Sequence, residues 1–308
     1  MTLVLYSVIA VSALVFTVAS VRRAVWYARH PLHLRWELYP VPHEAPDRVA
    51  HGGSYFETSE WWRGDRPVNR VGEWMFMARE IALLHALREY NRPLWYRSFP
   101  FHLGLYLLIV ATGGVLADAV AGMIAGRPGA ATLLRGGCAA IGTAGLVLAV
   151  AGAAGLLIYR RTDPALRVST TPGDLFNLGF FVVALGLVGA GLLARPAGAP
   201  GVWAVAEGLL RWDVTLQVPG LLAAGLVLSA LLAAYIPLTH MSHFIGKYFT
   251  YHAVRWDDRP LGGNRKIAAA LAESLTYRSR WAAGHVSSGQ PASWADVVAA
   301  NPAKEEQR

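Results

Sequence analysis

The sequence predicts an all-α integral membrane protein, a bundle of five transmembrane helices with an amphipathic helix at the membrane interface. The 308 residues are 54% hydrophobic and only 16% charged, which is the composition of a membrane protein. The apolar residues form long blocks, and a helix needs roughly 20 such residues to cross a hydrocarbon core about 30 Å thick. Five blocks reach that length: Leu3–Val21, Phe99–Gly122, Cys138–Tyr159, Leu175–Leu193 and Val218–Phe244.

The first block is interpreted as a retained helix and not as a signal peptide. No basic residue precedes its apolar run, and Arg22 and Arg23 follow it directly. The third block spaces Gly142, Gly145 and Gly152 among alanines, which predicts close packing against a neighbouring helix. The centres of the spans are read as Leu, Val, Ala and Gly, with only Asn177 breaking the pattern near an end. Such centres disfavour a transporter.

The basic residues predict the orientation. Segments 22–98, 160–173 and 247–308 hold 12, 3 and 9 Lys plus Arg, and the remaining loops hold four. By the positive-inside rule the amino terminus lies outside and the carboxy terminus is cytoplasmic, in a multi-pass protein of the inner (cytoplasmic) membrane. The net charge of +8 is then a topology signal with contacts to anionic lipid, and nucleic acid is excluded as its explanation.

Four regions are expected: a first transmembrane helix (1–21), a cytoplasmic loop (22–98), a four-helix membrane core (99–249) and a cytoplasmic tail (250–308). Within the loop, Trp74, Met77 and Ile81 recur at helical spacing, which predicts an amphipathic interfacial helix. The tail is polar and too short to form a core of its own, so we expect it to dock on a partner subunit.

Three histidines lie at or within the apolar blocks: His102, His240 and His243. Ionisable groups at that depth are functional candidates. His102 and His243 lie at matching depth on helices of opposite direction, with Gly104 and other glycines nearby, and this arrangement predicts a b-type haem with two imidazole ligands. Interfacial histidines bonded to backbone or headgroups are the alternative. A zinc site with His252 is disfavoured, because nine residues of continuous helix turn it away.

The other histidines are assigned ordinary roles. His85 is expected to be solvated or packed, and His285 to lie on the surface. The remaining three of the Pro-rich loop are expected to form a docking surface: His30, His33 and His43.

Three segments resemble the respiratory nitrate reductase gamma subunit (NarI-like) family of membrane cytochromes b: "RSFPFHLGLYLLIV", "RRTDPALRVSTTPGDLFNLGFF" and "YIPLTHMSHFIGKYF". The chain is more similar still to the gamma-like cytochromes of heterodisulfide reductase and of DsrM-type complexes. The resemblance covers all five helices in order, through the Phe-His-Leu-Gly and Thr-Thr-Pro-Gly-Asp patterns. It implies one haem b between the second and fifth helices, with the iron ligands at His102 and His243. His240 is then expected to support a ligand, to contact a propionate or to serve as the alternative ligand.

The same resemblance implies electron exchange between menaquinone or ubiquinone and a cytoplasmic iron–sulfur subunit similar to the heterodisulfide reductase D subunit. The chain has one cysteine, Cys138, and therefore no iron–sulfur ligand set of its own. The second, outer haem of the family is not expected, because its ligand positions fall on Thr112 and Gly225.

Arg97 and Lys247, with Arg160 or Arg161, are candidate partners of haem propionates or else ordinary positive-inside anchors. Tyr106 and Tyr235 are candidate hydrogen-bond donors to a quinone or else packing residues. The alternative function is a non-haem membrane anchor that tethers a cytoplasmic redox enzyme.

Overall fold

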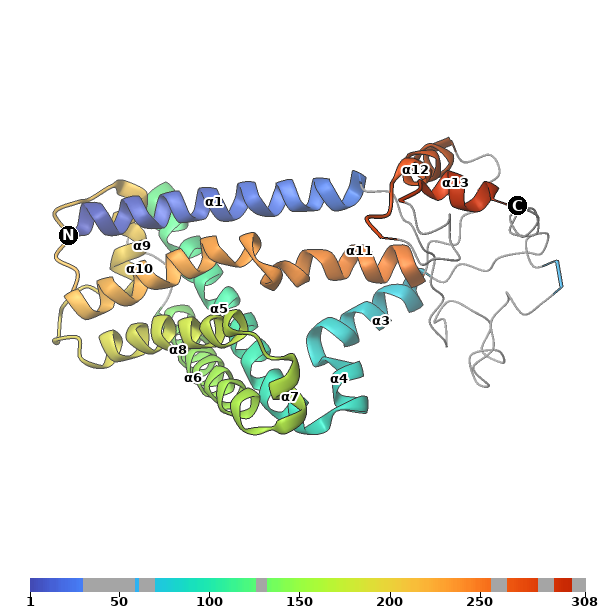
Figure 1. Ribbon diagram of the computed structural model, residues 1–308. Helices are drawn as coiled ribbons and strands as arrows, with labels where there is room; N and C mark the ends of the chain where they lie inside the picture. Colours follow the sequence, from blue (N-terminus) through green and yellow to red (C-terminus); the bar gives the residue numbers. More distant parts are fainter. Residues whose placement is uncertain (30–58, 61–69, 126–131, 256–264, 282–290, 301–308) are drawn as a thin grey trace. The chain divides into compact units, whose positions relative to one another are not determined.

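The computed structural model describes residues 1–29, 59–60, 70–125, 132–255, 265–281 and 291–300, and its regular elements in these ranges are all helices (Figure 1). Five helices are long and apolar enough to cross a membrane, which confirms the predicted number of spans. They are α1 (Thr2–Arg29), α5 (Arg92–Ala125), α6 (Thr132–Thr162), α8 (Pro172–Leu193) and α10 (Gly220–Tyr235). The shorter helices are α3 (Arg70–Leu83), α4 (His85–Tyr90), α7 (Pro164–Ser169), α9 (Val202–Arg211), α11 (His243–Arg255), α12 (Arg265–Thr276) and α13 (Trp294–Ala299).

The chain forms two compact units. The first comprises Met1–Ser20 with Met77–Ser242, and the second comprises Val21–Phe76 with His243–Arg308. The first unit therefore contains α5, α6, α8 and α10 in full, together with most of α1. His102 and His240 belong to the first unit, whereas His243 and Lys247 belong to the second.

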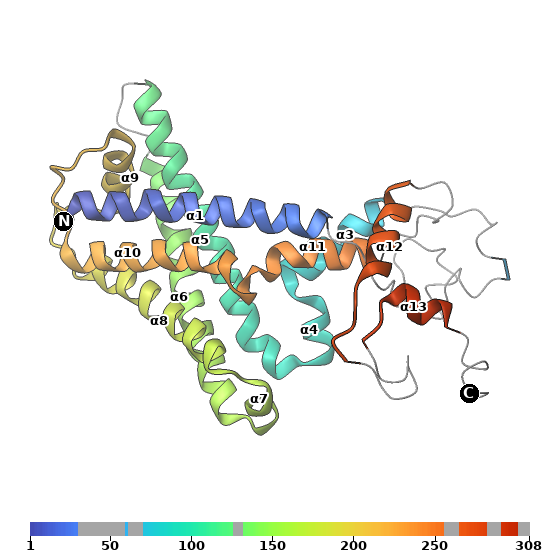
Figure 2. The same cartoon turned by 45° about the horizontal axis from the view of Figure 1, so that its top comes forward.

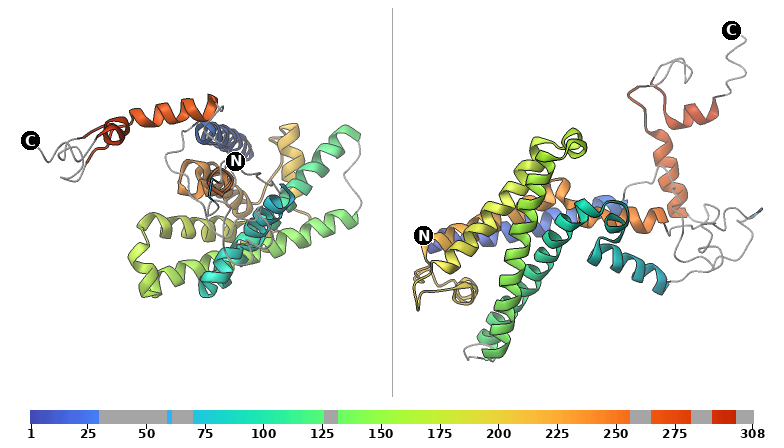
Figure 3. Two further views of the ribbon diagram at one scale, coloured as in Figure 1. Left: turned by 90° about the vertical axis from the view of Figure 1, so that its right-hand side faces the viewer. Right: turned by 90° about the horizontal axis from the view of Figure 1, so that it is seen from below.

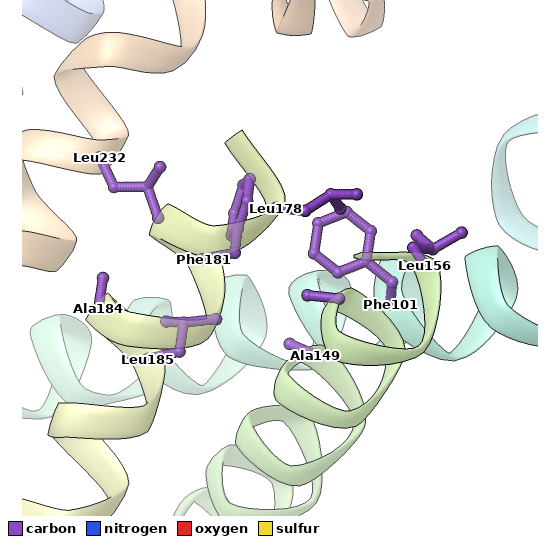
Figure 4. Packing of buried hydrophobic residues seen from close by; sticks show 9 residues of the cluster. Phe101, Ala149, Leu156, Leu178, Phe181, Ala184, Leu185 and Leu232 are labelled. Carbon is purple, nitrogen blue, oxygen red and sulfur yellow. The ribbon is translucent and has the colours of Figure 1, made fainter. Parts of the chain in front are cut away.

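The core of the first unit lies where α5, α6, α8 and α10 pack in succession. α5 runs along α6, α6 packs on α8, and α8 packs on α10, whereas α5 and α10 are not among the extensively packed pairs (Figures 2 and 3). Phe101 of α5 meets Phe181 of α8 edge to face, with ring centroids 4.9 Å apart (Figure 4). Leu178, Leu185 and Leu232 complete this apolar centre.

Small residues let α5 and α6 approach each other closely. A Cβ atom on Gly152 would lie 2.5 Å from the backbone nitrogen of Phe101, and one on Gly145 would lie 2.9 Å from the carbonyl oxygen of Gly104. Both distances are shorter than any real contact, so only glycine fits. The predicted packing role of the glycines in α6 is thereby confirmed for these two positions.

The fifth span is not the continuous helix to Phe244 that hydropathy suggested. α10 ends at Tyr235, two short 3-10 turns cover Ile236–Leu238 and His240–Ser242, and α11 begins at His243. Pro237 causes the break, because its nitrogen carries no hydrogen to donate to the preceding turn. The prediction of a single helix through Phe244 was therefore wrong.

Helix ends also differ from the apolar blocks. α1 continues through Arg22 and Arg23 to Arg29, and α5 begins at Arg92, before the first apolar residue of the block. An apolar block is only as long as the hydrocarbon core is thick, whereas a helix can continue beyond that length as long as its backbone hydrogen bonds continue.

The segment that was expected to form one amphipathic interfacial helix is helical, as two helices, α3 and α4. They are separated at Leu84, whose φ of 50° is left-handed. In the first unit the end of α3 is tied to α5: the Tyr106 hydroxyl donates to the Ile81 carbonyl at 2.8 Å, and the Trp95 indole donates to the Leu83 carbonyl at 2.8 Å. Tyr106 is thus engaged in holding α3.

The second unit has its own contacts. The ring of Tyr27 lies 5.7 Å from that of Phe249, and Ser293 caps α13 through a reciprocal bond with Asp296. The predictions for His30, His33, His43 and His285 fall outside the described residues.

Candidate functional site

His102 lies almost three turns after the start of α5, beside the core. Its Nδ1 lies 2.8 Å from the carbonyl oxygen of Ser98 and 3.3 Å from the Ser98 hydroxyl. A carbonyl only accepts hydrogen bonds, so the geometry favours the tautomer with the proton on Nδ1 and the lone pair on Nε2. Metal-binding histidines commonly show this arrangement, in which the ring nitrogen that does not bind the metal donates its hydrogen to a carbonyl.

The core holds the His102 ring in place. The neighbouring Phe101 is 7% exposed and is wedged against Gly152 and Phe181. The Phe101 and His102 rings meet edge on at 5.3 Å. The side chain of His102 is itself half-buried, as expected of an imidazole at the edge of an apolar core.

A cluster of polar side chains lies at the end of the first unit that also contains His102. Asn177 of α8 is 5% exposed. The Tyr235 hydroxyl donates to Asn177 Oδ1 at 3.0 Å, and Asn177 Nδ2 lies 3.3 Å from His240 Nε2. His240 Nε2 also lies 3.2 Å from Asp174 Oδ1. We name these four residues, Asp174, Asn177, Tyr235 and His240, the Asp174 network.

Two local features of the sequence bring the network together. Asp174 is fixed by a capping box at the start of α8, where its carboxylate accepts from the Thr171 backbone at 2.9 Å and from the Thr171 hydroxyl at 2.8 Å. The break at Pro237 ends α10 and places His240 in a 3-10 turn. The capping box and the break therefore orient the two partners from opposite sides.

His240 Nε2 has two partners that require different protonation states. An unprotonated Nε2 accepts from the Asn177 amide, whereas a protonated Nε2 donates to the Asp174 carboxylate. The network thus has a partner for Nε2 whether or not that nitrogen carries a proton. His240 is also accessible, since its side chain is 62% exposed, against 20% for Asp174.

The remaining predicted site residues of the first unit have other hydrogen-bond and stacking partners. The Arg97 guanidinium stacks 4.1 Å above the Tyr159 ring and donates to the Pro93 carbonyl. Gly104 is buried against the backbone of α6 near Ala149, so helix packing alone accounts for a glycine there. Arg160 lies 3.4 Å from the Thr170 hydroxyl.

His243 and Lys247 lie in the second unit. His243 is the exposed first residue of α11, and Lys247 is half-buried one turn later in the same helix. The structure thus brings His240 into contact with α8.

The opposite end of the first unit carries an ion cluster that the sequence reading missed. Arg135 of α6 bonds Asp118 of α5 at 2.7 Å and Glu207 of α9 at 3.0 Å. Asp118 is only 6% exposed. We name these three residues the Arg135 clamp. The statement that Asn177 alone interrupts the apolar spans was therefore wrong, since Asp118 lies within the predicted span Phe99–Gly122.

Comparison with known proteins adds no relative to this description. No family model matches the chain, no curated protein matches it, and no solved structure matches its fold.

Proposed function

We propose that this chain is a membrane cytochrome b subunit, which exchanges electrons between membrane quinol or quinone and a cytoplasmic iron–sulfur partner through a b-type haem. The observation that carries the proposal is the His102 imidazole, held by the Ser98 carbonyl with its lone pair on Nε2. The resemblance to the nitrate reductase gamma family agrees with it.

The chemistry of the donor fits a haem ligand. Neutral imidazole is a common axial ligand of haem iron, and a hydrogen bond from its other nitrogen raises its basicity. In this proposal His102 and His243 hold the iron, and the haem when bound supplies one-electron chemistry. The Phe101 ring, which meets the His102 ring edge on at 5.3 Å, makes one side of the imidazole apolar.

The cationic residues complete the proposal. Arg97 and Lys247 are assigned to haem propionates, because arginine and lysine bind carboxylates at the membrane edge. Arg97 would exchange its cation–π contact with Tyr159 for a charged partner. Since Cys138 is the only cysteine, the electrons leave to iron–sulfur centres of a separate subunit, which the polar tail and loop bind. The membrane is proposed to be the cytoplasmic membrane, with the amino terminus outside.

Haem content tests the proposal. The full chain is purified in detergent as wild type, His102→Ala, His243→Ala and the control His85→Ala, and haem is quantified by pyridine haemochrome. His85 is a suitable control because it lies in the short helix α4, with its side chain 49% exposed and 3.7 Å from Glu89. Circular dichroism and size exclusion verify that each variant is folded.

We expect one b-type haem per chain in the wild type and in His85→Ala, and none in the other two variants. A folded wild type without haem would contradict the proposal in favour of the membrane anchor. Haem that persists in His102→Ala would contradict the ligand assignment.

A further inference from the structure

We infer that the Asp174 network is a binding and proton-exchange site for the headgroup of a membrane quinone. The inference rests on the proposed function for the class of ligand. The site is drawn from the contacts of Asp174, Asn177, Tyr235 and His240.

The network matches a ligand whose oxygens alternate between carbonyl and hydroxyl. A quinone carbonyl needs a hydrogen-bond donor, which a protonated His240 supplies. The Tyr235 hydroxyl can supply another only in exchange for its bond to Asn177. A quinol hydroxyl needs an acceptor, which neutral His240 supplies. One imidazole can take either role here, because its Nε2 has an accepting partner at 3.2 Å and a donating partner at 3.3 Å.

The network is accessible, and its surroundings are apolar. The His240 side chain is 62% exposed. Phe176 is 58% exposed, and its ring meets that of Tyr235 edge on at 6.0 Å. Phe180 contacts the same tyrosine ring at 6.1 Å. An aromatic headgroup that arrives from the lipid thus meets aromatic faces first and polar atoms next to them.

Holding α10 against α8 does not require all four residues of the network. The bond from Tyr235 to the buried Asn177 already ties α10 to α8. An ion pair as exposed as His240 with Asp174 adds little to stability. The capping box of α8 accounts for the Asp174 carboxylate, so the exposed imidazole is the part that bracing leaves unexplained.

The proton step balances within the network. When a quinol hydroxyl faces neutral His240, its O–H bond breaks and an N–H bond forms on Nε2. The electron pair stays on the oxygen of the quinolate, so no electron leaves the ring in this step. The Asp174 carboxylate holds the new imidazolium charge at 3.2 Å, and Arg160 lies within electrostatic range of the same carboxylate. A carboxylate that orients and stabilises an imidazolium is a recurrent arrangement in proton transfer.

Photolabelling tests the site directly. The full chain in phospholipid nanodiscs is titrated with an azido-substituted benzoquinone carrying a decyl tail and illuminated, and the labelled peptides are mapped by mass spectrometry. Excess unmodified decyl-benzoquinone removes label that reflects a saturable site. His240→Gln and Tyr235→Phe are compared with His85→Gln, the same exchange at an exposed histidine of α4.

We expect saturable label in residues 174–180 or 235–242. Loss of one charge-assisted hydrogen bond predicts an affinity about tenfold lower in His240→Gln, a smaller loss in Tyr235→Phe and no change in His85→Gln. Because His240 is exposed, its exchange leaves the core intact. Saturable label elsewhere, or label insensitive to His240→Gln, would overturn the inference.

Haem measured in the same samples separates the two proposals. Intact haem with no saturable label at the network overturns this inference and leaves the proposed function standing. Saturable label at the network in a chain without haem supports the site and overturns the cytochrome proposal.

Discussion

The two ends of the membrane core both carry polar clusters, but the clusters differ in how their charges are satisfied. In the Arg135 clamp, Asp118 and Glu207 share one guanidinium at 2.7 and 3.0 Å, and Asp118 is 6% exposed. In the Asp174 network, the last member is an imidazole that is 62% exposed and has two alternative partners.

The difference separates a structural role from a chemical one. A buried carboxylate bound to arginine is expensive to disturb and offers nothing to a ligand. An accessible imidazole that accommodates both protonation states can exchange a proton. His102 lies at the same end of the core as the network. It follows Arg97 of α5 by five residues, and Arg97 stacks on Tyr159 near the end of α6. The candidate chemistry is thus concentrated at one end.

The largest effect on stability is expected at the clamp. Arg135→Met leaves the buried Asp118 without its cation, and the free energy of unfolding should fall by about 3 kcal/mol. Thermal unfolding in detergent measures it. Adding Asp118→Asn to Arg135→Met should restore most of the loss, because Glu207 is 35% exposed and reaches solvent. Equal stability of Arg135→Met and wild type would show that the clamp is not a brace.

The next effect is expected at the contact between α5 and α6. Gly152→Ala places a methyl group 2.5 Å from the Phe101 backbone nitrogen, so the helices must separate, at a cost of about 2 kcal/mol. Gly113→Ala is the control, since its Cβ would meet nothing within 4 Å. If both variants unfold at the wild-type temperature, the close approach of α5 and α6 is wrong.

A smaller effect is expected within the Asp174 network. Tyr235→Phe removes only the hydroxyl that Asn177 accepts at 3.0 Å, and we expect a loss of about 1 kcal/mol in unfolding free energy. Tyr96→Phe, at a tyrosine that is 64% exposed, should change it by less than about 0.5 kcal/mol. A loss in Tyr235→Phe as large as that in Arg135→Met would instead make the network structural.

The smallest effect concerns pH in the loop between α9 and α10. The Thr215 hydroxyl and backbone donate to Asp213 and lower the pKa of that carboxyl below 3.8. The stabilisation is therefore complete above the unfolded value and is lost as pH falls through the lowered folded pKa. Thr215→Val should raise the Asp213 pKa, which is measured by following the NMR chemical shift of the carboxyl carbon as pH is varied. The Asp296 pKa, which Ser293 lowers, should not change.

The spans were predictable from sequence, but their ends and breaks were read less well. Length and hydropathy suffice for five helices, because the hydrocarbon core sets both. Pro237 is present in the sequence, and a proline within a helical pattern predicts the end of α10. Asp118 was equally visible, since an acidic residue within a span calls for a partner.

The pairing of polar groups was not predictable in the same way. His240 meets Asp174 and Asn177 across 66 and 63 positions of sequence, and that contact depends on which helices pack together. The sequence singled out His240 and Asn177 separately, by their depth in the spans. Their contact required the packing of α8 on α10.

The most direct test of the account is reduction of the haem by a quinol. The purified chain is mixed with a reduced short-chain naphthoquinol under anaerobic conditions, and the reduced b-type absorption band is followed by stopped flow. The account predicts reduction in the wild type and none in His102→Ala, which lacks the haem ligand. A wild-type haem that dithionite reduces and quinol does not would contradict the account.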